Sequence, residues 1–261
     1  MGIMVTLVLR WQGFPLMNLI HLGRAGWVIV PMLVGAAGNL INDYFDVRED
    51  RINKPDKALV GRTVKRRVVV VTHWGFTAAA LIWSGWLSSS KGDSWPMTLV
   101  AVFSVILYLY SPLLKGRGAW GNVAISACVA GLVVWSGLAT LQGAHSPSSA
   151  LWMFALILGW FNFLREWIKD VQDMEGDFVA NHQTLAMQLT TQQNRFGVIV
   201  AIILGGAFVT IWSLQMNSSW LMMLPWLFAF FAALFSAMKF NPTSLSAWLK
   251  VLMGSLYLFI V

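Results

Sequence analysis

The chain has 261 residues, of which 57% are hydrophobic and 11% are charged, with a mean hydropathy of +0.66. Soluble globular domains carry roughly a quarter charged residues, so the composition excludes an ordinary soluble domain. The net charge is +7, but the basic residues lie mostly in short segments between apolar runs. This pattern argues against a nucleic-acid partner and favours anionic lipid headgroups and phosphorylated substrates.

Long apolar runs predict membrane-spanning helices, because about 17 to 25 apolar residues cross a bilayer. Residues 1–20 are mixed in character and lack a signal-peptide cleavage site. Strands of a β-barrel would alternate apolar and polar residues, and these runs do not. We therefore predict an all-α, polytopic membrane helical bundle that forms one domain over residues 1–261. The expected spans are 26–41, 68–88, 97–113, 119–141, 148–166, 196–214, 219–237 and 244–261.

The first expected span leads directly into an acidic cluster. Asp43, Asp46 and Asp50 are spaced by three and four residues, which predicts three carboxylates on one face of a helix. Asn42 adds an amide oxygen to that face. Carboxylates stacked in this way repel one another unless a cation lies between them, and oxygen ligands without His or Cys suit Mg²⁺. The alternative is a solvated acidic helix end, balanced by the basic loop that follows.

A second acidic cluster repeats this spacing far downstream. Its members are Asp170, Asp173 and Asp177. Apart from Asp93, all of the eleven acidic residues fall within one of these two short windows. Solvation of the surface does not explain such a concentration.

The two clusters are expected on the same side of the membrane, because four spans lie between them. The loops on that side carry fourteen Lys and Arg residues, whereas the opposite connectors between complete spans hold only Lys91. The positive-inside rule therefore places both clusters at the cytoplasmic face. The arrangement also indicates a rough internal repeat, and membrane proteins often build a central site between such halves.

Two facing carboxylate triads predict divalent cations that bridge a polyphosphate. Diphosphate leaves readily once metal ions neutralise its charge, and an allylic carbocation remains. The chain contains 15 Trp and 16 Phe, enough to line a dry, aromatic pocket for such a cation. The expected donor is a long-chain prenyl diphosphate with its tail in the bilayer.

The two motifs resemble the paired signatures of the UbiA-type intramembrane prenyltransferase superfamily. They read Asn42-Asp43-x-x-Asp46-x-x-x-Asp50 and Asp170-x-x-Asp173-x-x-x-Asp177, and the resemblance extends over nearly the whole chain. The flanking segments 51–56, 110–115 and 175–177 are most similar to the geranylgeranylglycerol-phosphate geranylgeranyltransferase-like branch. The resemblance implies nine helices around a central cavity. Only 41 residues precede Asn42, so we expect eight to nine helices with a shortened first one.

The resemblance also implies roles for individual residues. Two Mg²⁺ ions would be held by Asn42, Asp43, Asp46, Asp50, Asp170, Asp173 and Asp177. Substrate would be bound by Arg51, Lys57, Lys115, Arg165 and Lys169. Catalytic roles would fall to Asp46, Asp173, Lys115 and Tyr110.

Simpler roles are open for several of these residues. Lys115 is equally consistent with an ordinary basic loop residue, and Tyr110 with an aromatic anchor at the membrane interface. Arg165 and Lys169 share a helix face with Glu166, so internal ion pairing competes with substrate binding. Cys128 and the four His residues show no metal-ligand spacing.

The expected function is Mg²⁺-dependent transfer of a prenyl group to a lipophilic acceptor, favouring a geranylgeranylglyceryl phosphate-type ether lipid. Alternative enzymes are an aromatic prenyltransferase acting on a quinone precursor and a UbiA-type terpene cyclase. A cation transporter is a non-enzymatic alternative, although transport sites usually lie near mid-membrane rather than at helix ends. We expect an integral protein of the cell inner membrane, in contact with membrane lipids and without an obligate protein partner.

Overall fold

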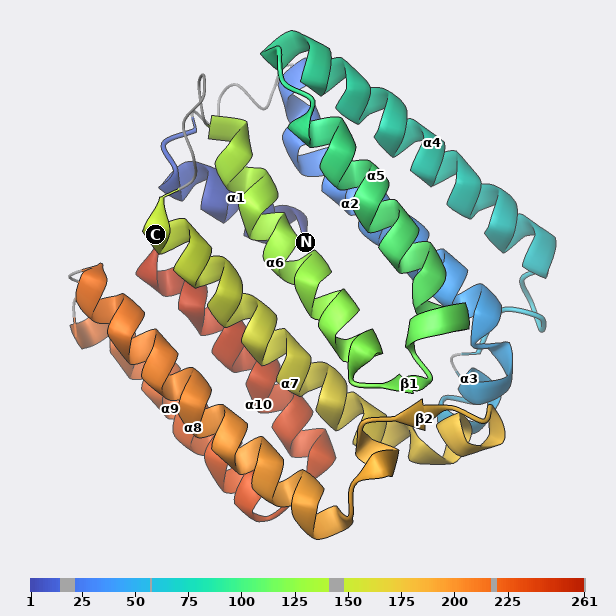
Figure 1. The fold of residues 1–261 in the computed structure, drawn as a ribbon, viewed down its shortest axis with the longest axis vertical. Coiled ribbons are helices and arrows are strands. Elements are labelled where there is room, and N and C mark those ends of the chain that lie inside the picture. The colour runs from blue at the N-terminus through green and yellow to red at the C-terminus, as the bar shows by residue number, and fades with distance from the viewer. Residues whose placement is uncertain (15–21, 57, 141–147, 217–219, 261) are drawn as a thin grey trace.

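The computed structural model describes residues 1–261 except 15–21, 57, 141–147, 217–219 and 261. The described part is almost entirely helical, as the apolar runs predicted (Figure 1). Its helices are α1 (Gly2–Trp11), α2 (Leu22–Phe45), α3 (Val47–Asn53), α4 (Arg66–Lys91), α5 (Trp95–Leu109), α6 (Trp120–Thr140), α7 (Ser149–Val179), α8 (Thr191–Gln215), α9 (Trp220–Met238) and α10 (Pro242–Ser255). A π-helical turn, Tyr110–Leu114, extends α5, and short 3₁₀ helices occupy Ala186–Gln188 and Leu256–Phe259.

Six helices among the described residues are long and apolar enough to cross a membrane. They are Ala25–Phe45, Arg66–Lys91, Trp95–Leu114, Trp120–Thr140, Ser149–Val179 and Thr191–Leu214, and they match the first six expected spans. The last two expected spans correspond to α9 and α10. The ten residues of α1 give a helix of about 15 Å, half the thickness of the hydrocarbon core.

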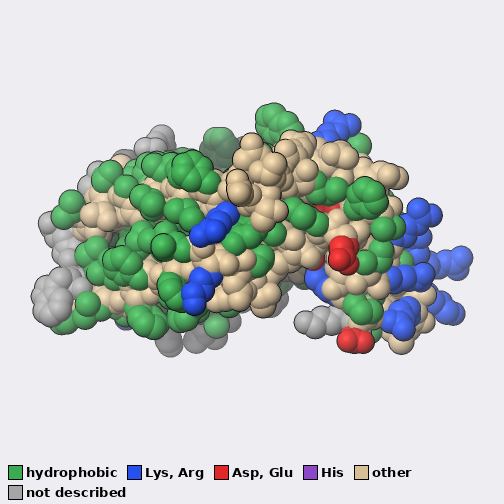
Figure 2. Space-filling model, turned by 90° about the horizontal axis from the view of Figure 1, so that it is seen from below, with side chains coloured by type: hydrophobic (Ala, Val, Ile, Leu, Met, Phe, Trp, Pro, Cys, Tyr) green, Lys and Arg blue, Asp and Glu red, His purple; other side chains and the backbone are tan. Residues whose placement is uncertain are grey.

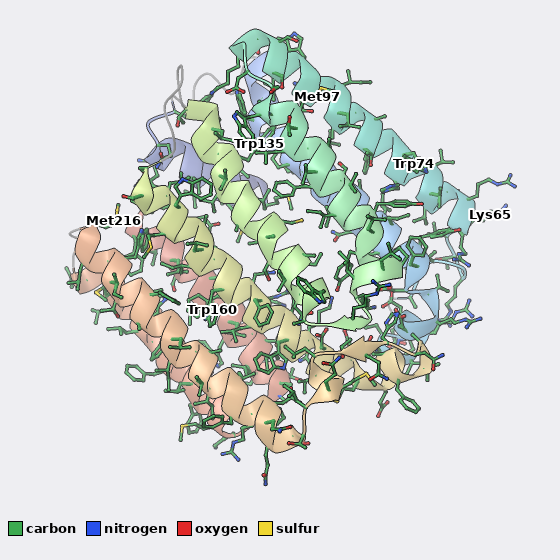
Figure 3. All side chains as sticks on the ribbon, viewed as in Figure 1. Lys65, Trp74, Met97, Trp135, Trp160 and Met216 are labelled. Carbon is green, nitrogen blue, oxygen red and sulfur yellow. The ribbon has the colours of Figure 1, made fainter. Side chains whose placement is uncertain are left out.

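The helix α7 holds the bundle together. It runs through the middle of Figure 1, with α8, α9 and α10 on one side and α2, α4 and α5 on the other. Phe154 and Phe161 of α7 are fully buried in the larger of two hydrophobic clusters, which also includes residues of α6, α8, α9 and α10. On the α8 side, the Trp160 indole donates a hydrogen bond to the Ala201 carbonyl at 2.9 Å (Figure 3). The smaller cluster joins α1, α2, α4, α5 and α6.

The first acidic cluster does not lie on one continuous helix, so that expectation was wrong. The helix α2 ends at Phe45, Asp46 forms a turn with φ −83° and ψ 14°, and α3 starts at Val47. An uninterrupted helix would stack the three carboxylates on one face, where they repel one another. After this break, α3 contacts α7.

The second acidic cluster lies on a helix that continues without interruption. We expected the span to end near residue 166 and a loop to follow, but α7 continues to Val179. Its 31 residues give a length of about 46 Å, well beyond the hydrocarbon core. The carboxylates of this cluster are therefore presented by a protruding, regular helix end.

Two short strands join the loops at this end of the bundle. Strand β1 (Arg117–Gly118) follows α5 and its π-helical turn, and β2 (Gln183–Thr184) follows α7. They pair in parallel, with Arg117 opposite Gln183 (Figure 1). The loop that carries Lys115 is thereby tied to the loop that carries His182.

Candidate active site

Both acidic clusters line one polar cavity of about 270 Å³, which we call the acidic cavity. Their expected placement at the same end of the bundle is thus confirmed. Its lining consists of Asn39, Asn42, Asp43, Asp46, Glu49, Asp50, Asn53, Lys54, Tyr110, Lys115, Lys169, Asp170, Asp173 and Asp177. All seven residues predicted to bind metal are present, and their role as ligands stays a prediction.

Lys115 neutralises the first acidic cluster. Its ammonium donates hydrogen bonds to Asp46 Oδ2 at 2.7 Å and to Glu49 Oε2 at 2.8 Å. Burial opposes the charge of this ammonium, but the two carboxylates outweigh burial and raise the pKa of Lys115. Burial also raises the pKa of Glu49 to about 7, although the neighbouring ammonium acts in the opposite direction. Lys115 is therefore a partly buried cation held by carboxylates rather than a free loop residue.

Asn42 connects this cluster to the π-helical turn after α5. Its amide Nδ2 donates to Asp46 Oδ2 at 2.8 Å, and the Ser111 hydroxyl donates to its Oδ1 at 2.8 Å. The turn also carries the buried Tyr110. These bonds hold the end of α2 against the segment that leads to Lys115.

The second cluster is less well compensated. Asp170 accepts a hydrogen bond of 2.9 Å from Asn122 Nδ2. Asp177 is only 1% exposed, and neither of its carboxylate oxygens has a hydrogen-bond partner among the described residues. His182 Nδ1 lies 3.7 Å from Asp177 and 3.4 Å from Glu49. A buried carboxylate whose oxygens accept no hydrogen bond is costly, so this position is well suited to a bound cation.

Asn53 and Lys54, at the end of α3, connect the two clusters. Asn53 Nδ2 donates to the Asp173 carbonyl at 3.2 Å, and its Oδ1 accepts from the Gly176 amide at 3.1 Å. A Cβ atom on Gly176 would lie 2.3 Å from Asn53 Nδ2, so this close approach requires glycine. The Lys54 ammonium lies 4.0 Å from Asp50 and 3.8 Å from Asp173.

A second cavity of about 360 Å³, the apolar cavity, adjoins the acidic one. The two share the lining residues Asn39, Asn42, Tyr110 and Lys169. The side chains that make the apolar cavity hydrophobic include Val34, Val100, Phe103, Leu107, Ile125, Val129, Leu132 and Trp135. A substrate with a charged head and a hydrocarbon tail matches this pair of cavities.

The predicted substrate-binding residues are distributed unevenly. Lys115 lines the acidic cavity and Lys169 lines both, whereas Arg165 lines only the apolar cavity. Arg51 is exposed on α3 and lines neither cavity. Lys57 falls outside the described residues. In the space-filling view, Lys and Arg side chains gather at one end of the molecule, close to the visible carboxylates (Figure 2).

The acidic cavity suits a hard cation by the chemistry of its donors, which are carboxylate and amide oxygens. In the described part of the chain, no group of three or more His, Cys, Asp or Glu side chains converges closely enough to hold an ion as it stands. The ammonium of Lys115 lies between Asp46 and Glu49 instead. Bound metal ions would compete with this ammonium for carboxylate oxygens.

Comparison with known proteins identifies the family. The model of the UbiA prenyltransferase family matches residues 1–260. The chain belongs to the UbiA prenyltransferase family.

Relatives within the UbiA family include two archaeal proteins named digeranylgeranylglyceryl phosphate synthase. The protein of Methanopyrus kandleri is 35% identical over 157 residues, covering 60% of this chain and 54% of the relative. That of Methanobrevibacter smithii is 36% identical over 152 residues, covering 57% and 52%. The chain thus spans about half the length of these curated relatives.

A solved structure has the same fold. Its subject is described as the biosynthesis of digeranylgeranylglyceryl phosphate synthase in membranes. The TM-score is 0.67 at 20% sequence identity, with 99% of this chain and 91% of the other chain covered. The two proteins therefore share the helical architecture described above.

Several residues of the site were not predicted as functional. Glu49 and Asn53 lie within the first acidic window, but they are not part of the spacing that defines the carboxylate triad. Ser111, Asn122 and His182 come from other segments and reach the acidic clusters only through folding. Ser111 lies within the family-like segment 110–115, but no role was predicted for it.

Proposed function

We propose that this UbiA family member transfers a prenyl group from a long-chain prenyl diphosphate to a hydroxyl of a geranylgeranylglyceryl phosphate-type ether lipid. The main support is the junction of the two cavities, which share four lining residues. A diphosphate in the acidic cavity and a prenyl tail in the apolar cavity would place the allylic carbon at this junction. The archaeal relatives named digeranylgeranylglyceryl phosphate synthase support the choice of acceptor.

The cofactor in this proposal is a pair of Mg²⁺ ions, with one set of ligands supplied by each acidic cluster. Asn42, Asp43, Asp46 and Asp50 would form the first set, and Asp170, Asp173 and Asp177 the second. Bound Mg²⁺ would neutralise the charge that develops on the leaving diphosphate. The buried carboxylate of Asp177, which accepts no hydrogen bond among the described residues, supports this assignment.

The basic residues of the cavity would bind the diphosphate oxygens that remain free. Lys115 and Lys169 line the acidic cavity and are placed to do so, together with Lys54. The bond between the allylic carbon and the diphosphate oxygen would break first. The face of the Tyr110 ring, which lines both cavities, would stabilise the resulting carbocation.

The orientation follows from the distribution of charge. Fourteen Lys and Arg residues lie in the loops and helix ends on the side of the acidic clusters, so we place the acidic cavity at the cytoplasmic face of the cell inner membrane. The donor and the acceptor would both reach the site from the bilayer.

The test is a transfer assay on purified protein in nanodiscs with radiolabelled geranylgeranyl diphosphate and Mg²⁺. Geranylgeranylglyceryl phosphate, 4-hydroxybenzoate, dihydroxynaphthoate or no acceptor would be offered, each with an EDTA control. A Mg²⁺-dependent adduct with the glycerol phosphate lipid alone supports the proposal. Reaction with an aromatic acceptor would identify a quinone-precursor enzyme instead, and a cyclic hydrocarbon formed without acceptor would identify a cyclase.

A further inference from the structure

One carboxylate stands apart from both acidic clusters. Seven of the eleven acidic side chains line the acidic cavity, and Asp56, Asp93 and Glu175 line neither cavity. The remaining acidic residue, Glu166, lines the apolar cavity. This residue is only 6% exposed, so its carboxylate is surrounded largely by protein.

Two cations pair with the Glu166 carboxylate. The Arg165 guanidinium donates a hydrogen bond to Glu166 Oε1, and the Lys169 ammonium lies 3.8 Å from Oε2. A buried carboxylate stays charged only when it is paired in this way. All three side chains line the apolar cavity, and Lys169 also lines the acidic one. A carboxylate paired with two cations therefore lies next to the junction of the cavities.

The proposed reaction needs a proton acceptor at this place. In displacement of diphosphate, the hydroxyl oxygen of the acceptor approaches the allylic carbon from the side opposite the leaving group. With diphosphate in the acidic cavity, that side is the apolar cavity. The carboxylates of the acidic cavity would be engaged by metal ions, whereas Glu166 lines the apolar cavity, from which the acceptor approaches.

We infer that Glu166 is the general base that removes the proton of the acceptor hydroxyl, an inference that rests on the proposed function. The bond between the allylic carbon and diphosphate breaks, and its electron pair leaves with diphosphate. A bond forms between the acceptor oxygen and the allylic carbon, and the hydroxyl proton passes to the Glu166 carboxylate. The oxonium formed in this attack is a strong acid, so a carboxylate paired with two cations is basic enough.

The experiment compares Glu166→Gln with the unaltered chain, using geranylgeranylglyceryl phosphate and an analogue in which a thiol replaces the reacting hydroxyl. Glu166→Gln should slow transfer to the hydroxyl by about 100-fold, the typical contribution of a general base. Transfer to the thiol should fall less than about threefold, because a thiol ionises without this base. The matched control is Glu175→Gln, an exposed carboxylate on the same helix, with both activities unchanged.

A second variant guards against a folding defect in the first. Glu166→Asp keeps the charge but withdraws the carboxylate by one methylene, and it should show an intermediate loss with the hydroxyl acceptor only. Equal losses with both acceptors in both variants would show that Glu166 merely positions Arg165 and Lys169, which overturns the inference. Unchanged transfer to the hydroxyl would also overturn it.

The same assay separates this inference from the proposed function. If the unaltered chain transfers no prenyl group to the glycerol phosphate lipid, the proposed function fails and the role of Glu166 fails with it. If the unaltered chain is active and Glu166→Gln is equally active, only the role of Glu166 is refuted.

Discussion

The two acidic clusters share a sequence spacing but differ in structure. The first is divided by the helix break at Asp46 and is neutralised by Lys115, which binds Asp46 and Glu49. The second lies on the unbroken helix α7, where Asp177 is buried without a hydrogen-bond partner among the described residues. The first cluster thus has a cation of its own, whereas the second depends more on a cation from outside.

The largest expected effect is on activity and is common to both clusters. Asp46→Ala and Asp173→Ala should each lower prenyl transfer by about 1,000-fold or more, because each removes a proposed metal ligand. Transfer assays and thermal unfolding would be measured together, and the variants should remain folded. Near-normal activity in either variant would contradict the two-metal arrangement.

The next effect concerns the cation that belongs to the first cluster. Lys115→Ala would leave Asp46 and Glu49 facing each other without their ammonium, at a cost of about 3 kcal/mol in the free energy of unfolding. Denaturant unfolding in detergent, with EDTA, would measure this loss. Added Mg²⁺ should recover part of the lost stability. The control is Lys250→Ala, because Lys250 lies on α10 and lines neither cavity.

The second cluster should respond in the opposite direction. Without Mg²⁺, Asp177→Asn removes a buried charge that accepts no hydrogen bond and has His182 beside it at 3.7 Å, and it should raise the free energy of unfolding by about 1–2 kcal/mol. Asp46→Asn should not stabilise, because its carboxylate already binds Lys115. Thermal unfolding with EDTA would compare the two, and a stabilised Asp46→Asn would remove the distinction between the clusters.

The smallest effect concerns the contact that joins the clusters. Asn53→Ala removes two hydrogen bonds to the backbone of α7 and should cost about 1–2 kcal/mol. It should also raise the Mg²⁺ concentration needed for half-maximal transfer, because the clusters are no longer held in register. Gly176→Ala, which would crowd Asn53, should have the same effect on Mg²⁺ dependence. An unaltered Mg²⁺ dependence in both variants would show that the contact is only structural.

Much of the fold could be predicted from sequence because membrane spans are a property of local composition. Long apolar runs gave six of the helices that can cross a bilayer, and counting spans correctly placed both acidic clusters at one end. The helix break at Asp46 escaped prediction, since i, i+3, i+7 spacing fits a continuous helix equally well. The length of α7 was not predicted either, because hydropathy alone makes the charged residues after 166 resemble a loop.

The sequence alone determined the kind of chemistry: two oxygen-rich clusters, basic residues beside them and apolar spans around them. Tertiary structure decided which side chains meet. Lys115 is 66 residues from Glu49 in the chain, and Asn53 is 123 residues from Gly176, yet each pair is in hydrogen-bond contact. The tertiary structure also places Glu166 in the apolar cavity, apart from the carboxylates that line the acidic cavity. Such pairings depend on how helices pack against each other, and no local spacing encodes that.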